Sequence, residues 1–321
     1  MIKLTPGKYR GLQKISTSQG TITALALDHR QNLRRSLNPN DPSQASDADL
    51  TRFKMEVTAA LADQATAVLL DPEYSAAQAL AAGLIPKQVG LVVALESTGY
   101  TGDPDARGAQ ILPGWSVEKA KRMGADAIKL LVYYHPKSPT AAEVEAFVRQ
   151  VAAQCQQYDL ALMLEPLSYS LDRRLTKLPA EEKHDVVVET ARRLTTSGAD
   201  ILKAEFPLDM LSNPNETEWI AACAEISSAS AIPWILLSAA IEFDAFLRQV
   251  KAACQAGASG IAVGRAVWQE AVKMDGAARL EFLRSTGRDR LARLTALCTE
   301  SGRSITDYYR VDVVSDWYKP Y

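Results

Sequence analysis

The chain has 321 residues, of which 47% are hydrophobic and 23% charged, and its formal net charge at pH 7 is −2. This length suits one α/β barrel of roughly 200 to 400 residues, and the near-neutral charge argues against a nucleic-acid partner. No apolar run approaches the ~20 residues of a membrane span, so we expect no membrane partner. Residues 1–14 are charged and lack the apolar core of a signal peptide, so we expect a cytoplasmic protein.

Short apolar runs rich in Val, Ile, Leu and Ala recur along the chain. There are eight, at residues 21–27, 66–70, 90–95, 125–134, 160–164, 199–206, 233–237 and 259–263. Such runs suit parallel strands that are covered on both sides. Amphipathic segments lie between them, for example at residues 49–64, 140–157 and 242–257. Eight strand–helix alternations predict an α/β fold, a (β/α)8 TIM barrel, in a single domain over residues 1–321.

Helices outside this repeat are expected at both ends of the chain, at residues 6–16 and 277–301. The alternative fold is an open, doubly wound sheet. That fold requires a glycine-rich phosphate turn after its first strand. Here the first strand runs into Asp28, His29 and Arg30 without a G-x-G pattern, which favours the barrel.

Most of the expected strands end on a polar or charged residue. These residues are Asp28, Asp71, Glu96, Glu165, Ser238 and Arg265. Barrel enzymes place their active sites at the C-terminal ends of the strands. The sequence therefore predicts a functional site at that end.

Two lysines, Lys129 and Lys203, differ from these because each lies inside its apolar run. A lysine there cannot easily extend to solvent, and burial disfavours its charge, so we expect a lowered pKa. Successive strands carry Lys129, Glu165 and Lys203, so these side chains should converge at one end of the barrel. The alternative is that each lysine pairs with a buried carboxylate and only supports the barrel.

This arrangement favours amine chemistry. A Schiff base requires an unprotonated amine near neutral pH, which burial and an adjacent cation both promote, so that Lys129 can activate Lys203. A nearby carboxylate such as Glu165 can move the protons for carbinolamine dehydration and carbon–carbon cleavage.

Small residues and backbone N–H groups follow the last two strands, at Ser238, Ala239 and Gly264. Loops at these positions commonly bind phosphate in barrels. Arg265 adds a guanidinium group, which is permanently charged and whose hydrogen-bond donors lie in one plane. The alternative is a tight strand-to-helix turn with Arg265 on the surface. His29 follows the first strand and is expected to face the mouth of the barrel.

Metal and acyl-transfer chemistry have no support in the sequence. His29, His135 and His184 show no ligand spacing, and no G-x-S-x-G elbow is present. We therefore expect neither a metal ion nor another cofactor. The four cysteines form no C-x-x-C pair and are expected to be reduced and buried.

Six motifs, taken in chain order, are similar to the tagatose-1,6-bisphosphate aldolase family of class I aldolases. They are ALALDHR (24–30), IKLLVYYHP (128–136), LMLEPLSY (162–169), ILKAEFP (201–207), LLSAA (236–240) and GIAVGRAVW (260–268). The resemblance extends over nearly the whole chain, and the ILKAEFP and LLVYYHP segments are its most specific parts.

This resemblance implies a role for each matching residue. Lys203 would form the Schiff base, Glu165 would be the general acid and base, Lys129 the auxiliary lysine, and Asp28 a polar partner of the substrate hydroxyls. The resemblance also places Ser238 and Arg265 where the family binds a phosphate. The chain departs from the family at His29, where many members have glutamine.

The implied reaction is reversible cleavage of tagatose 1,6-bisphosphate to dihydroxyacetone phosphate and glyceraldehyde 3-phosphate. The alternative is cleavage of another phosphorylated ketose, such as 6-deoxy-6-sulfofructose 1-phosphate. A third hypothesis is a non-catalytic regulator that binds a sugar phosphate. Such a regulator is expected to have lost Lys203 or Glu165, and both are present here. The residues leave the oligomeric state open, with a homo-oligomer as one option.

Overall fold

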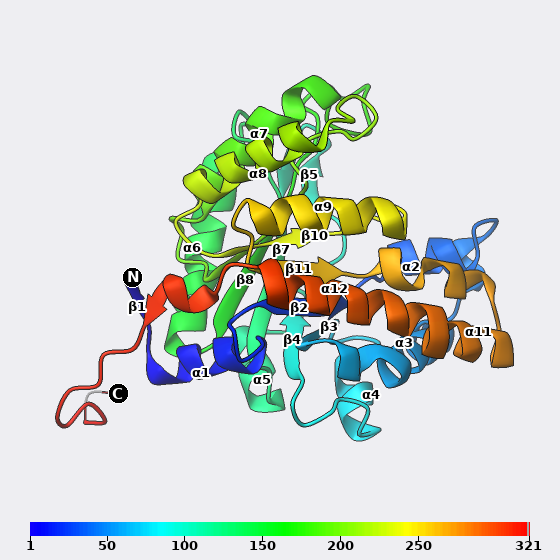
Figure 1. The fold of residues 1–321 in the computed structure, drawn as a ribbon, viewed down its shortest axis with the longest axis horizontal. Helices are drawn as coiled ribbons and strands as arrows, with labels where there is room; N and C mark the ends of the chain where they lie inside the picture. Colours follow the sequence, from blue (N-terminus) through cyan, green and yellow to red (C-terminus); the bar gives the residue numbers. More distant parts are fainter. Residues whose placement is uncertain (320) are drawn as a thin grey trace.

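Eight parallel strands close into a barrel in the computed structural model, which describes residues 1–319 and 321 (Figure 1). The hydrogen-bonded order around the barrel is β10-β11-β2-β3-β4-β7-β8-β9. The predicted TIM barrel is confirmed, and seven strands lie within their apolar runs, while β8 continues three residues beyond its run to Leu167. The strands are β2 (Ile22–Ala26), β3 (Ala67–Leu70), β4 (Gly90–Ala94), β7 (Ala127–Tyr133), β8 (Ala161–Leu167), β9 (Ile201–Ala204), β10 (Trp234–Leu237) and β11 (Gly260–Val263).

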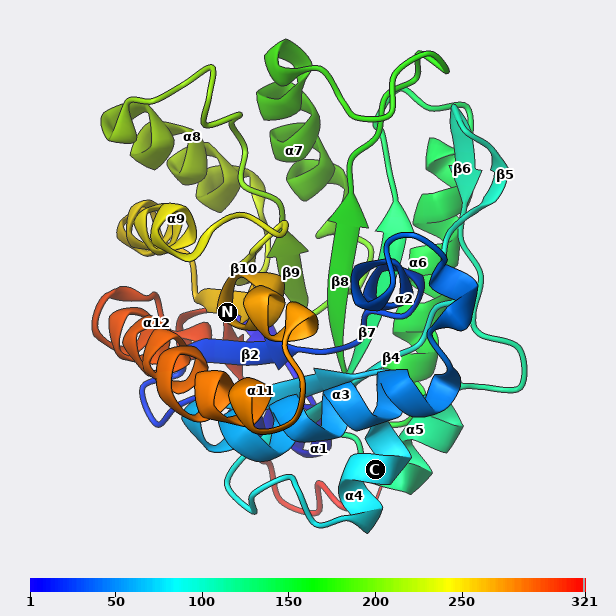
Figure 2. The same ribbon diagram turned by 90° about the vertical axis from the view of Figure 1, so that its right-hand side faces the viewer.

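Helices surround the strands on the outside (Figure 2). The longer ones between or after barrel strands are α3 (Asp47–Leu61), α6 (Ala141–Gln157), α7 (Ala180–Leu194), α8 (Glu216–Ala229), α9 (Phe243–Gln255) and α12 (Arg288–Ser301). The shorter ones are α2 (Gln31–Leu37), α4 (Ala76–Ala81), α5 (Val117–Met123), α10 (Arg265–Trp268) and α11 (Gly276–Phe282), with 3₁₀ turns at Pro42–Gln44, Ala62–Gln64, Gln269–Lys273 and Ile305–Asp307.

Two small sheets lie outside the barrel. β5 (Thr101–Asp103) and β6 (Ala106–Gly108) form an antiparallel hairpin within the connection from β4 to α5. β1 (Ile2–Lys3) pairs in parallel with β12 (Tyr309–Arg310), which brings both ends of the chain to the same end of the molecule (Figure 1).

Local sequence signals set several helix ends. Ser46 and Asp49 form a reciprocal capping box at the start of α3, which satisfies two backbone donors that the first turn leaves free. α5 ends at Gly124, whose φ of 98° lies in the left-handed region that glycine adopts without steric cost.

The two terminal helices differ from their expected bounds. α1 (Pro6–Lys14) ends two residues before the expected end at residue 16. The expected helix over residues 277–301 is interrupted by a π-helical turn at Leu283–Gly287, which separates α11 from α12. A π turn inserts about one extra residue into a single turn of the helix. The hydrophobic pattern of the sequence does not reveal such a local insertion.

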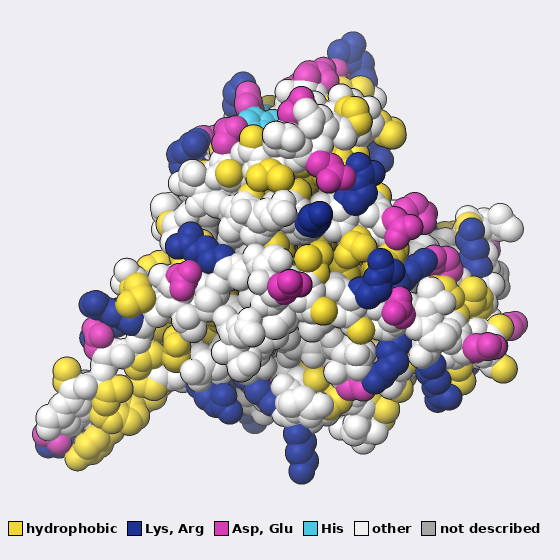
Figure 3. All heavy atoms as spheres, in the orientation of Figure 1, with side chains coloured by type: hydrophobic (Ala, Val, Ile, Leu, Met, Phe, Trp, Pro, Cys, Tyr) yellow, Lys and Arg dark blue, Asp and Glu magenta, His cyan; other side chains and the backbone are white. Residues whose placement is uncertain are grey.

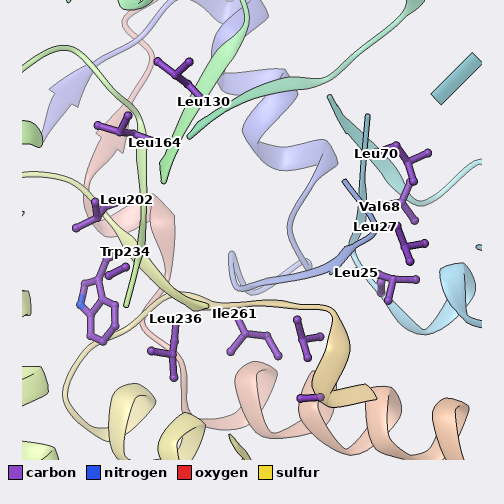
Figure 4. Close-up of a cluster of buried hydrophobic side chains, with 14 of the residues drawn as sticks. Leu25, Leu27, Val68, Leu70, Leu130, Leu164, Leu202, Trp234, Leu236 and Ile261 are labelled. Atoms are coloured by element: carbon purple, nitrogen blue, oxygen red, sulfur yellow. The ribbon is translucent and has the colours of Figure 1, made fainter. Parts of the chain in front are cut away.

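Side chains of the strands alternate between the inside and the outside of the barrel. The outward side chains pack against the surrounding helices (Figure 4): examples are Leu25, Leu130, Leu164, Leu202 and Leu236. The inward positions belong to a separate buried cluster that includes the small residues Ala24, Ala26, Ala127, Ala161 and Ala262. Small inward residues leave space within the barrel.

The N-terminal end of the barrel is closed by α1. Leu12 and Ile15 of this helix are fully buried in the inner cluster. Lys8 Nζ lies 3.0 Å from Asp200 Oδ2, and both side chains are buried. The barrel therefore opens at its C-terminal end.

The surface carries charges of both signs, which are interspersed over the face shown in Figure 3. The four cysteines are buried and unpaired, as expected. Across residues 1–319 and 321, no helix combines the length and the apolar character needed to cross a membrane.

Candidate active site

The C-terminal ends of the strands open into a cavity of about 530 Å³. Residues at the ends of β2, β4, β7, β8, β9, β10 and β11 line it. The nine residues to which the sequence assigned a role lie in this lining: Asp28, His29, Lys129, Glu165, Lys203, Ser238, Ala239, Gly264 and Arg265. Asp71, another polar strand end, is not part of the lining, because it is buried in an ion pair with Lys54.

A chain of ion pairs crosses the floor of this cavity. Lys129 Nζ lies 2.7 Å from Asp28 Oδ2, 2.7 Å from Glu96 Oε1 and 3.0 Å from Glu165 Oε2. The other oxygen of Glu165, Oε1, lies 2.7 Å from Lys203 Nζ. Each of these five side chains is at most 10% exposed.

The strand register brings these groups together. β7 and β8 pair Leu131 with Glu165, which places Glu165 one inward position above Lys129. β8 and β9 pair Met163 with Ile201, and the two inward residues that follow on these strands are Glu165 and Lys203. The three side chains converge as the strand order predicted.

The expectation of a lowered pKa is wrong for Lys129. Burial opposes its charged form, but Asp28, Glu165 and Glu96 together raise its pKa well above the usual lysine value. The sequence showed the burial of Lys129 but not the number of carboxylates around it. Lys129 is therefore a fixed cation.

The two lysines also hold their carboxylate partners in the ionised form. Burial opposes ionisation of Glu165, yet Lys129 and Lys203 lower its pKa below the usual value. Asp28 is likewise buried, and the same two lysines lower its pKa strongly. Three carboxylates thus face two lysines on the cavity floor.

Glu96 is a member of this network that the sequence marked only as the polar end of a strand. Its Oε2 accepts a hydrogen bond from the Leu131 backbone N–H at 3.0 Å. Arg30 Nη2 donates to the Glu96 carbonyl at 2.6 Å, and Arg30 Nη1 pairs with Glu73 at 2.6 Å. Glu96 and Glu165 therefore hold Lys129 from the two sides of its strand. Arg30 in turn supports Glu96.

Arg265 lies at another part of the cavity, where β11 passes into α10. Over the described part of the chain it forms no ion pair with a carboxylate, and its buried Nε has no hydrogen-bond partner. Burial lowers its pKa, although a guanidinium remains charged at neutral pH. An uncompensated, partly buried cation of this kind suits an anionic ligand.

The loop after β10 contacts the same region. The Gly264 backbone N–H donates to Ser238 Oγ at 3.4 Å. A Cβ at Gly264 would lie 2.8 Å from the Ala26 carbonyl oxygen, so this position requires glycine for space. Ala239 and Ala240 have φ values of 43° and 60°, a left-handed conformation that is uncommon for residues other than glycine and that concentrates at functional loops.

His29 lines the cavity beside Arg265's strand and packs edge-on against Trp268, with ring centroids 5.5 Å apart. Burial, assisted by Arg265 and Lys203, lowers its pKa to about 3. The imidazole is therefore neutral at physiological pH and can offer one donor and one acceptor.

A further wall of the cavity includes residues that the sequence did not single out. Tyr100 and Tyr133 line it, and their rings pack edge-on with centroids 5.3 Å apart. The guanidinium carbon of Arg107, on β6, lies 4.4 Å from the Tyr100 ring centroid and 5.0 Å from that of Tyr133. Such cation–π contacts hold the two rings in position. Arg35, from α2, lines the same cavity.

A family model described as "DeoC/LacD family aldolase" matches residues 22–270. The chain is 30% identical to tagatose 1,6-diphosphate aldolase 2 of Enterococcus faecalis, over 95% of this chain and 97% of the relative. It is 31% identical to tagatose 1,6-diphosphate aldolase 1 of Streptococcus pyogenes, over 98% of both chains.

Solved structures share the fold. A fructose-bisphosphate aldolase from Slackia heliotrinireducens aligns with a TM-score of 0.63 at 17% identity, over 94% of each chain. A Schiff base forming fructose-1,6-bisphosphate aldolase aligns with a TM-score of 0.58 at 22% identity, over 87% of this chain and 98% of that one. At these identities the likeness shows a shared barrel fold.

Proposed function

Because this chain belongs to the DeoC/LacD family of aldolases, we propose that it cleaves a phosphorylated ketose through a Schiff base on Lys203. As an aldolase it is a carbon–carbon lyase. The lead substrate is tagatose 1,6-bisphosphate, which yields dihydroxyacetone phosphate and glyceraldehyde 3-phosphate reversibly. The relatives from Enterococcus faecalis and Streptococcus pyogenes are named for this sugar.

The observation that carries the proposal is the contact between Lys203 Nζ and Glu165 Oε1, 2.7 Å apart on the floor of the cavity. An amine beside a carboxylate that can take its proton has the arrangement of an activated nucleophile. The cavity volume of about 530 Å³ lies within the range of small-molecule sites, roughly 300 to 1,000 Å³.

The contacts favour Lys203 over Lys129 as the nucleophile. Lys129 touches three carboxylates, and its raised pKa keeps the proton on its amine. Lys203 pairs with Glu165 alone among the described residues. A single proton transfer to Glu165 therefore frees the Lys203 amine.

Proton transfers in the first half of the reaction follow from this pair. Lys203 gives a proton to Glu165 and attacks the ketone carbon, so a C–N bond forms and the carbonyl π electrons move to oxygen. A second amine proton moves to that oxygen, which gives a neutral carbinolamine. Glu165 then protonates the hydroxyl group, which leaves as water, and a C=N iminium remains.

In the second half, the ionised Glu165 removes the proton of the C4 hydroxyl. The C3–C4 bond breaks, its electrons move into the iminium to form an enamine, and the aldehyde leaves. Protonation of the enamine at C3 and attack of water then release the ketone product and restore the Lys203 amine. Lys129 contributes its fixed charge, which keeps Glu165 and Asp28 ionised and leaves Asp28 able to accept hydrogen bonds from substrate hydroxyls.

The phosphate next to the ketone is assigned to Arg265, with Ser238, Ala239 and Gly264. Ser238 and Ala239 follow β10, Gly264 and Arg265 follow β11, and β10 is the neighbour of β9 in the barrel. A phosphate on C1 that is bound there would therefore lie close to the carbon that Lys203 attacks. His29 offers a neutral hydrogen-bonding group nearby.

Cleavage rates on a panel of ketose phosphates test the proposal. The panel contains tagatose 1,6-bisphosphate, its fructose epimer and 6-deoxy-6-sulfofructose 1-phosphate. We expect the highest kcat/KM on tagatose 1,6-bisphosphate. Preference for the sulfonated sugar would contradict the substrate, and no cleavage of any member would contradict the reaction.

A further inference from the structure

Five lysine and arginine side chains line the cavity: Arg30, Arg35, Lys129, Lys203 and Arg265. Three of them are neutralised by carboxylates, since Arg30 pairs with Glu73, Lys203 with Glu165, and Lys129 with three partners. Within residues 1–319 and 321, Arg35 and Arg265 have no carboxylate partner. The cavity therefore presents two uncompensated guanidinium groups.

These two arginines belong to different walls. Arg265 begins α10, one residue after the end of β11, whereas Arg35 is carried by α2, which follows β2. α2 lies at the end of the molecule remote from both chain termini, as the barrel mouth does (Figure 1). Two separate cations of this kind match a ligand with two separate anionic groups.

The side chains around Arg35 support a binding role. Arg35 is exposed at the rim of the cavity, and its Nη1 donates a hydrogen bond to Asn32 Oδ1 at 3.3 Å. The amide side chains of Gln31 and Asn32 line the same cavity and can donate further hydrogen bonds.

The preceding residue, Arg34, provides an internal contrast. Its guanidinium pairs with Asp47 and donates to the Ala45 carbonyl, and it does not line the cavity. Adjacent residues on a helix point about 100° apart. Of these two neighbouring arginines, Arg34 therefore forms a structural ion pair and Arg35 faces the cavity.

We propose that Arg35, with Gln31 and Asn32, binds a second anionic group at the end of the ligand remote from the ketone. This assignment rests on the proposed function, in which Arg265 binds the phosphate next to the ketone. The cavity then takes a dianionic sugar, and phosphate and sulfonate share the chemistry that Arg35 recognises. Arg35 thereby selects for ketoses that carry an anion at C6.

Calorimetric binding of two unreactive sugars tests this site apart from catalysis. Hexitol 1,6-bisphosphate and hexitol 1-phosphate both lack the carbonyl group that Lys203 requires. Loss of a charged hydrogen bond at Arg35→Gln should weaken binding of the bisphosphate by roughly ten- to a hundredfold. The affinity for the monophosphate should stay within about twofold, because an exposed charge that touches no ligand contributes little.

The matched control is Arg149→Gln, which removes an exposed arginine of α6 that does not line the cavity. This variant should bind both hexitols as the unmodified protein does. Equal weakening of both ligands by Arg35→Gln, or no weakening of either, would overturn the assignment.

Kinetics separate this inference from the proposed function. With ketose 1,6-bisphosphate or 6-sulfonated ketose 1-phosphate, Arg35→Gln should raise KM and leave kcat close to that of the unmodified protein. The anion whose KM rises more is the one that the site recognises. The unmodified protein could cleave none of these ketoses and still bind the bisphosphate selectively, with Arg35→Gln abolishing that selectivity. This outcome would support the anion site and contradict only the proposed substrate.

Discussion

Lys203 Nζ lies 2.7 Å from Glu165 Oε1, and the second oxygen of the same carboxylate lies 3.0 Å from Lys129 Nζ. One carboxylate therefore touches both buried lysines of the cavity. Because Lys129 also contacts Asp28 and Glu96, the two lysines have unequal surroundings. This inequality leads to different predicted behaviour for two residues that look alike in the sequence.

Covalent trapping should identify the nucleophile. Incubation with dihydroxyacetone phosphate and borohydride should add one adduct, which peptide mapping should place on Lys203. Lys203→Ala should abolish both adduct and turnover, since no other amine contacts Glu165 without being held by further carboxylates. An adduct mapped to Lys129, with Lys203→Ala still active, would reverse the assignment.

Removal of Lys129 should move the pH dependence to higher pH. Lys129 helps to lower the pKa of Glu165, so Lys129→Met should raise that pKa. Glu165 must be ionised to accept protons, and the acidic limb of the kcat/KM profile should therefore shift upward. Activity at neutral pH should fall on the order of a hundredfold, the lower range for loss of acid–base catalysis.

The pH profile of Lys129→Met needs two comparisons. Lys137→Met, at an exposed lysine in the loop after β7, should retain the unmodified profile. The Lys129→Met protein should still form some borohydride adduct at Lys203, but more slowly. An unchanged acidic limb in Lys129→Met would show that Lys129 does not control Glu165.

Arg265→Ala should weaken binding of the phosphorylated substrate. Charged hydrogen bonds of this type contribute roughly 1.5–3 kcal/mol, or about one to two decades in KM. Steady-state kinetics provide the measurement, with Arg149→Ala as the control at an exposed site. If KM and kcat are both unchanged, the phosphate does not bind at Arg265.

Activity should survive exhaustive chelation. The three carboxylates of the cavity floor already contact the ammonium groups of Lys129 and Lys203. The class I mechanism takes its electrophile from the iminium. Turnover measured after prolonged dialysis against EDTA should equal that of untreated protein. Loss of turnover that zinc restores would rule out the Schiff-base reaction as written here.

The barrel and its main site residues could be predicted from sequence for a physical reason. A short, continuous apolar run indicates a strand that is covered on both sides. Strand side chains alternate with a period of two, so the face on which a lysine lies follows from its position in the run. The order of the strands along the chain then placed Lys129, Glu165 and Lys203 on neighbouring strands of the barrel. Both kinds of information are local or sequential.

The pKa of Lys129 was predicted in the wrong direction because its cause is not local. Asp28 and Glu96 are separated from Lys129 by 101 and 33 residues, and they reach it only when β4 pairs with β7 and the barrel closes around them. Burial was visible in the sequence, whereas the number of carboxylates around the amine was decided by the tertiary structure.

Arg35 shows the same limit more sharply. In sequence it is one of two adjacent arginines in a short polar helix, and nothing distinguishes it from Arg34. Ion pairing with Asp47 occupies Arg34, while the placement of α2 at the barrel mouth leaves Arg35 facing the cavity. Local periodicity thus determined the barrel and the lysines within it, but the environment of each charge depends on contacts between distant segments, which only folding creates.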